Sequence, residues 1–149
     1  MTLDQSYVGR VYPPTEPYEV SREKIREFAD ALNDPNPAYR DAAAAGELGH
    51  PDVIAPPTFG IILTLQAGHQ VITDPGFGMD YSRVVHGEQR FEHVRPIRAG
   101  DVLQVVVAVE SVRAAAGNDI VGLRAEVRTV DGAEILRAFS TIVARGTAA

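Results

Sequence analysis

A proline-rich loop carries the side chains that are best suited to proton chemistry in this chain. The segment DPNPAY, residues 34–39, places the carboxylate of Asp34 and the phenol of Tyr39 five residues apart, with the amide of Asn36 between them. A carboxylate can exchange protons in general acid–base catalysis. A phenol, with a reference pKa of about 10, is a poor base at neutral pH but can donate a hydrogen bond to water or a carbonyl. Asn36 either holds a local Asx-type turn or contacts a substrate.

Four histidines are candidates for the base that Tyr39 cannot supply. His86 is the best placed, because it lies in the polar segment VHGEQ, residues 85–89. Simple strand alternation would put His86 on the face of Glu88 and opposite Gln89, but a bulge at Gly87 would break that pattern. The alternative is a structural histidine at a dimer seam. The other three are His50, which lies in a loop, and His69 and His93, which have no set of catalytic residue types around them in the sequence.

The densest group of basic residues consists of four arginines: Arg83, Arg90, Arg95 and Arg98. Their guanidinium groups could bind a phosphate group or an acidic protein. A solvated sheet edge would explain the same residues. The chain has no cysteine, no metal-ligand spacing, no glycine-rich phosphate loop and no serine-nucleophile motif. Neither a metal nor a cofactor is therefore predicted.

Composition and charge narrow the class of protein. The 149 residues are 45% hydrophobic and 23% charged, which predicts a single globular domain over residues 1–149. The formal net charge is -6 with no block of basic residues, so neither nucleic acid nor an anionic membrane is an expected partner. No apolar run approaches the roughly 20 residues that cross a bilayer, and the N-terminus lacks the order of a signal peptide. We therefore expect a cytoplasmic protein.

Helical periodicity predicts two helices in the first half of the chain. After an irregular arm with a short strand near residues 18–20, Ser21 is the expected N-cap of an amphipathic helix over 22–32, which the prolines of the DPNP segment end. A short helical turn is expected at 41–45. Residues 57–72 predict a second helix that begins with Pro57 and Thr58 and is apolar nearly all round. A helix of that kind is expected to be buried.

Strand periodicity replaces helical periodicity in the second half. Segments at 82–93, 102–113, 119–130 and 133–145 alternate between apolar and polar residues and are separated by turn residues. Their connections are too short for parallel crossovers, so we predict an antiparallel meander. A buried helix before such a meander predicts an α+β fold in which an antiparallel sheet wraps around a central helix.

That order of elements is shared by the hot-dog fold, and three motifs resemble one branch of it. DPNPAYRD, residues 34–41, resembles the D-x-N-P-[IL]-H-x-D motif of MaoC-type (R)-specific enoyl thioester hydratases, with Tyr39 in the place of the histidine. APPTFGII (55–62) and VHGEQ (85–89), followed by RPIRAGD (95–101), resemble the N-terminal half of the double hot-dog hydratase 2. Over about residues 5–145 the chain also resembles UPF0336-like proteins and the non-catalytic acyl-binding subunit of mycolic-acid-type (3R)-hydroxyacyl-ACP dehydratases.

The resemblance implies roles for individual residues. For the four arginines, it implies contact with the phosphate of CoA or phosphopantetheine, or with an acidic carrier protein. In the related hydratases the motif's aspartate and histidine share the proton transfers, and helix N-terminal N–H groups steady the thioester oxygen. Asp34 therefore matches the acid–base aspartate, and Asn36 matches the motif's asparagine. Tyr39 makes the dyad degenerate, with His86 as a possible substitute base. The start of the predicted buried helix would line an acyl or pantetheine channel, or would only cap and pack the helix: Pro57, Thr58, Phe59 and Gly60.

Three hypotheses of function follow, all within fatty acid metabolism. The first is a non-catalytic subunit that binds the acyl chain of an acyl-CoA or acyl-ACP, while a MaoC-like partner chain supplies the aspartate and histidine. The second is a self-sufficient homodimeric (R)-specific enoyl-CoA hydratase or dehydratase, a hydro-lyase that uses Asp34 with Tyr39 or His86. The third is a catalytically silent acyl-binding homodimer. Pairing is expected in each case, because a partner completes the exposed sheet edge of a hot-dog domain.

Overall fold

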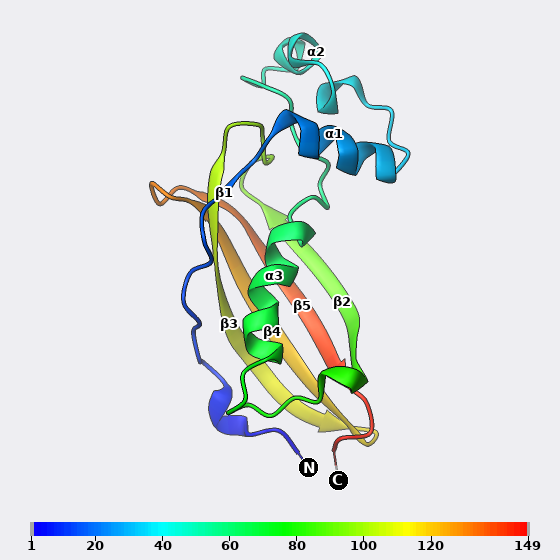
Figure 1. Ribbon diagram of the computed structural model, residues 1–149, viewed down its shortest axis with the longest axis vertical. Coiled ribbons are helices and arrows are strands. Elements are labelled where there is room, and N and C mark those ends of the chain that lie inside the picture. Colours follow the sequence, from blue (N-terminus) through cyan, green and yellow to red (C-terminus); the bar gives the residue numbers. More distant parts are fainter. Residues whose placement is uncertain (1, 149) are drawn as a thin grey trace.

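The computed structural model of the chain describes residues 2–148 and shows an antiparallel sheet curled around one helix (Figure 1). The helices are α1 (Arg22–Ala31), α2 (Ala42–Glu47) and α3 (Ile61–Ile72), and single 3-10 turns cover Gln5–Tyr7, Pro37–Tyr39 and Tyr81–Arg83. The strands are β1 (Tyr18–Glu19), β2 (Val84–His93), β3 (Val102–Ala115), β4 (Asn118–Thr129) and β5 (Glu134–Ala144). The predicted α+β architecture is confirmed, since α3 is the helix that the sheet encloses.

The order of the strands differs from the predicted meander. β3, β4 and β5 are neighbours in sequence order, but β2 pairs with β5, and the sheet order is β1-β3-β4-β5-β2. The place beside β3 is taken by β1, where Tyr18 pairs with Leu103. The meander was wrong at β2 because a short connection restricts the direction of a strand but does not choose its neighbour.

α3 starts later and is more exposed than the sequence predicts. The N–H groups of Ile61 and Ile62 bond to the carbonyl oxygens of Thr58 and Phe59, so tight turns precede the α-helical geometry. Leu65 is 53% exposed, so α3 has an outward side although its sequence is apolar nearly all round. Within the described residues, no helix combines the length and apolar character that crossing a membrane requires.

α1 and α2 lie beyond one end of the sheet, close to the start of α3 (Figure 1). The predicted N-cap of α1 is confirmed, because the Ser21 side chain accepts a hydrogen bond from the Lys24 N–H at 3.1 Å. The Phe28 ring of α1 packs edge-on against the Phe59 ring, with 5.4 Å between the ring centroids. This contact fixes α1, and the loop that follows it, over the N-terminal end of α3.

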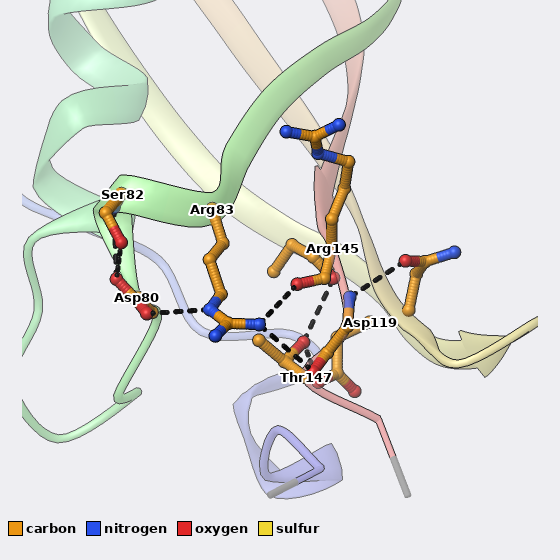
Figure 2. Close-up of polar contacts among 9 residues, drawn as sticks. Asp80, Ser82, Arg83, Asp119, Arg145 and Thr147 are labelled. Atoms are coloured by element: carbon orange, nitrogen blue, oxygen red, sulfur yellow. Dashed lines mark hydrogen bonds and ion pairs between the residues drawn. The ribbon is translucent and has the colours of Figure 1, made fainter.

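Residues near both ends of the described chain bind the end of the sheet that lies away from α1 and α2. Figure 2 shows Asp119 there, among the residues around the C-terminal segment. Asp119, at the start of β4, is buried. Its carboxylate accepts hydrogen bonds from the Leu3 N–H at 3.2 Å and from the Thr147 hydroxyl at 2.6 Å. One side chain therefore joins the N-terminal arm, the sheet and the C-terminal segment.

Replacing Asp119 with alanine should destabilise the fold by about 1–3 kcal/mol, because two donors lose a buried acceptor. The free energy of unfolding from urea denaturation measures the effect. The control is Glu110→Ala, which removes an exposed carboxylate from β3. Equal losses of stability in the two variants would contradict this account of the chain ends.

Candidate functional site

Two successive side-chain caps shape the loop that carries the degenerate motif. The Asp34 carboxylate accepts a hydrogen bond from the Asn36 N–H at 3.1 Å, and the Asn36 side-chain oxygen accepts one from the Ala38 N–H at 3.0 Å. The second bond starts the 3-10 turn that ends at Tyr39. Asx-type caps of this kind explain why the sequence turns here. No hydrogen bond joins the Asp34 carboxylate to a histidine in the part of the chain that the structure describes.

Tyr39 is held in its protonated form at neutral pH. The side chain is only 7% exposed, and burial raises the pKa of its phenol. The charge of Asp34 raises the pKa further, while a hydrogen bond with the Asn36 side chain partly offsets both effects. The phenol can donate a hydrogen bond but cannot serve as a general base near pH 7.

A pocket of about 260 Å³ opens beside Tyr39, between the loop before α3 and the end of β2. His93 also lines this pocket, and its Nε2 lies 2.9 Å from the Pro57 carbonyl oxygen. A carbonyl can only accept, so Nε2 carries the proton and Nδ1 keeps a lone pair when the ring is neutral. The structure thus brings His93 to Tyr39, a pairing that the sequence did not indicate because the two residues lie far apart along the chain.

A β-bulge in β2 changes the face on which the residues after His86 lie, and His86 itself is exposed. The register between β2 and β5 shifts between His86 and Glu88, as the glycine between them allowed. His86 and Gln89 consequently share one face, and the His86 Nε2 lies 3.1 Å from the Gln89 side-chain oxygen. Simple alternation would have separated these two side chains, so the bulge creates the pair.

The His86 side of β2 borders a second hollow, which we call the α1–β2 groove after two of the elements that line it. Its volume is about 500 Å³, and α1, the α3 region and β2 all contribute to its walls. The lining residues are mostly apolar: Phe28, Leu32, Thr58, Ile61, Leu65, His86, Gln89 and Phe91. His86 is therefore separated from Tyr39, which lines the other pocket.

The four residues predicted at the start of the helix fall into different environments. Pro57 lines the Tyr39 pocket and Thr58 lines the α1–β2 groove. Phe59 is buried in the core against α1. A Cβ on Gly60 would lie 3.0 Å from a Leu136 methyl carbon, so this glycine allows α3 to approach β5 closely. Two of the four residues thus border a hollow, and two serve packing.

Arg83 is engaged by the chain's own C-terminal segment. Its guanidinium lies 3.5 Å from the carbonyl oxygens of Arg145 and Gly146, and Figure 2 shows it directed at Arg145. The same group pairs with Asp80 at 3.3 Å. These contacts give Arg83 a structural role at the end of the sheet where the chain termini lie.

The other three arginines lie apart from Arg83. Arg90 stacks over the Phe139 ring at 4.1 Å. Arg95 forms a bidentate pair with the buried Asp101 at 2.8 and 2.9 Å, and Arg98 approaches the same carboxylate at 4.0 Å. The predicted basic residues therefore do not form one cluster, and two of them share the single carboxylate of Asp101. Among residues 2–148, no group of three or more His, Asp or Glu side chains could hold a metal ion.

A sheet wrapped around α3, with a polar loop and an apolar groove at the start of that helix, defines a hot-dog domain of the MaoC-like dehydratase type. A solved MaoC-like dehydratase matches with a TM-score of 0.86 and 34% identity, over 94% of this chain and 42% of that one. The C-terminally truncated HadBC (3R)-hydroxyacyl-ACP dehydratase complex of Mycobacterium tuberculosis matches with a TM-score of 0.82 and 32% identity, over 92% and 96%. The chain spans less than half the length of the first of these proteins.

Residues 6–138 match the family model described as FAS1-like, dehydratase domain region. The UPF0336 protein of Streptomyces coelicolor is 59% identical over 145 residues, 97% of each chain. The UPF0336 protein of Saccharopolyspora erythraea is 57% identical over 148 residues, 99% of this chain and 95% of the relative. The chain belongs to this UPF0336 family, within the FAS1-like dehydratase region group.

Alkaline titration tests the state of Tyr39. The pKa of Tyr39 is higher in the folded chain than in the unfolded chain, where it is about 10. The protonated phenol therefore stabilises the fold fully below that unfolded pKa, and this stabilisation is lost as pH rises through the folded pKa. In a titration followed by phenolate absorbance, Tyr39→Phe should therefore show a smaller rise in absorbance above pH 10 than the parent protein shows.

The late ionisation should shrink rather than vanish, because burial and Asp74 also raise the pKa of Tyr12. The control Tyr81→Phe, which alters an exposed ring, should leave the whole late phase in place. A Tyr39→Phe titration curve that differs from the parent only near pH 10 would refute a raised pKa.

Proposed function

We propose that the chain is the acyl-thioester-binding, non-catalytic subunit of a (3R)-hydroxyacyl-ACP or -CoA dehydratase. The observation that carries the proposal is the protonated phenol of Tyr39 at the position where a hydratase motif has an imidazole. Dehydration removes a proton from the alpha carbon and the hydroxyl from the beta carbon, which requires a base that is effective near neutral pH. A partner hot-dog chain with an intact aspartate and histidine would supply that base.

The backbone at the start of α3 supports the same assignment. A thioester oxygen that gains negative charge needs free N–H donors. Here four N–H groups already donate to carbonyl oxygens three residues earlier, those of Phe59, Ile61, Ile62 and Leu63. The helix start therefore uses these four donors in its own turns, which leaves fewer N–H groups for a thioester oxygen.

The α1–β2 groove suits the hydrocarbon chain of an acyl thioester. Aromatic and aliphatic side chains form most of its wall, among them Phe28, Ile61 and Phe91. Burial of apolar surface contributes roughly 25 cal/mol per Å², so an acyl chain gains affinity with each methylene that the groove covers. The Tyr39 pocket is smaller and lies on the other side of the loop that precedes α3.

The β2 edge supports a partner chain. β2 ends the sheet, and none of the described strands pairs with its outer side. An unpaired edge is a template for a second chain. Exposed apolar side chains accompany this edge and the outward side of α3: Leu32, Leu65, Tyr81 and Val85. The HadBC dehydratase, 32% identical, is itself described as a complex.

A homodimer that catalyses alone is the second candidate, and one observation favours it. His93 shares the Tyr39 pocket and keeps Nδ1 available as a base. In that arrangement His93, and not His86, would replace the motif histidine. The two candidates differ in whether this chain's own polar residues are needed for turnover.

The double variant Leu65→Glu with Val85→Lys should weaken assembly through the β2 edge at least tenfold, because burying unpaired charge is costly. Sedimentation of the chain, alone and co-expressed with a MaoC-type chain from the neighbouring gene, measures the assembly. The matched control is Val130→Lys, which changes a side chain that is 48% exposed and follows β4. Unchanged assembly of the double variant would rule out this interface.

Reconstituted enzyme should tolerate Asp34→Asn or His93→Ala in this chain, with turnover of a (3R)-hydroxyacyl thioester altered by less than about threefold. The partner's motif aspartate, changed to asparagine, should cost about a hundredfold or more, as expected for general acid–base groups. Steady-state turnover of the separate and mixed chains provides the measurement. Efficient hydration of an enoyl thioester by this chain alone, abolished by His93→Ala, would favour the homodimer instead.

A further inference from the structure

The N-terminal arm, residues 2–17, runs along the outer edge of β3 (Figure 1). The Gly9 N–H donates a hydrogen bond to the Val109 carbonyl oxygen at 2.8 Å. The Tyr12 N–H donates one to the Val107 carbonyl oxygen at 2.9 Å. β1 continues this contact, so the chain's own N-terminal residues occupy the β3 edge of the sheet.

The strand segment that the arm covers has the composition of a segment that aggregates when exposed. Residues 102–109 read VLQVVVAV and contain five valines, with neither a charge nor a proline. Short segments with high β-propensity and low net charge pair readily with identical segments. The same segment in a second copy of the chain carries no charge either, so no charge repulsion would oppose pairing of two uncovered β3 edges.

The arm itself is a poor template for a further strand. Pro13, Pro14 and Pro17 lack a backbone N–H and cannot donate to a neighbouring strand. Within the described part of the chain, strand pairing of the N-terminal residues with β3 is limited to the bridge between Val11 and Ala108 and to the two residues of β1. The arm therefore satisfies the β3 edge without creating a new edge of the same kind.

Contacts with the loop after α3 hold the arm in place. The Tyr12 phenol donates a hydrogen bond to the Asp74 carboxylate at 2.8 Å, and the Arg10 guanidinium lies 3.9 Å from that carboxylate. The Tyr7 ring stacks on the Phe77 ring, with 4.7 Å between the centroids. Residues near a chain end are poorly ordered unless contacts of this kind tie them down. The two tyrosines therefore anchor the arm on β3.

We propose that the N-terminal arm is a guard that keeps a second copy of this chain from extending the sheet at β3. With β3 covered, β2 is the edge that stays open to a partner, so association ends in a closed pair instead of an open stack of sheets. This role is independent of what the α1–β2 groove binds, because β2 and β3 lie at opposite sides of the sheet order.

Tyr7→Ala combined with Tyr12→Ala should release the arm. Amide hydrogen exchange at Val109, whose N–H donates to the arm, should become about tenfold faster, while amides of β4 keep their rates. Sedimentation should show species larger than those of the parent protein, and their size should increase with concentration. The matched control is Val8→Ala with Val11→Ala, which changes two exposed side chains of the same arm and should alter neither readout.

A third change in the released protein locates the new contact. Val106→Lys adds a charge to β3, opposite Glu126 of β4, and charge on an open edge opposes pairing. The larger species should therefore disappear although the arm stays released. Larger species that persist would overturn the guard role, because they would form through another surface. Fast exchange at Val109 with the assembly state of the parent protein would overturn it as well.

The amides of β4 show whether the double variant keeps its fold. If they lose protection, Tyr12→Phe replaces the double variant, because it removes one hydrogen bond and retains the ring. Faster exchange at Val109 together with larger species would then support the guard role. Unchanged exchange or an unchanged assembly state would overturn it.

Discussion

The close packing of α3 on the sheet is the contact on which the rest of this chain depends. Gly60 and Gly68 face the sheet, where added Cβ atoms would lie 3.0 Å from a Leu136 methyl and 3.6 Å from a Leu123 methyl. Small residues on this face let the helix approach the curled sheet, and larger ones would hold it away. Both hollows border the loop or helix at the N-terminal end of α3, so their shape follows from how closely that helix sits.

The general architecture could be predicted from the sequence because its signals are local. Ser21 at an N-cap and the alternation in β3 and β4 report on residues that are close along the chain. The choice of β5 as the neighbour of β2 depends on contacts between distant segments, which periodicity does not contain. The sequence left two possibilities at Gly87, a bulge or regular alternation, because a glycine permits a bulge without requiring it.

The candidate site also has one part that local sequence predicts and one part that depends on contacts between distant segments. Asp34, Asn36 and Tyr39 could be recognised together because one loop holds them. His93 joins Tyr39 only because the end of β2 returns to the loop before α3, and nothing near His93 in sequence indicates this. The four arginines were grouped because they are close in sequence, but they lie apart in the structure. A strand advances about 3.3 Å per residue, so Arg83 and Arg95, which lie near each other in sequence, flank the whole length of β2.

Loop geometry also accounts for a motif that keeps its aspartate and asparagine beside a tyrosine. In this chain the Asp34 carboxylate caps the Asn36 N–H, and the Asn36 side chain caps the Ala38 N–H. Both side chains therefore hold the turn whether or not a proton is transferred. The ring of Tyr39 fills a buried position beside this turn. Under the proposed function, a loop built in this way keeps its shape without a base of its own, and the base would come from a partner chain.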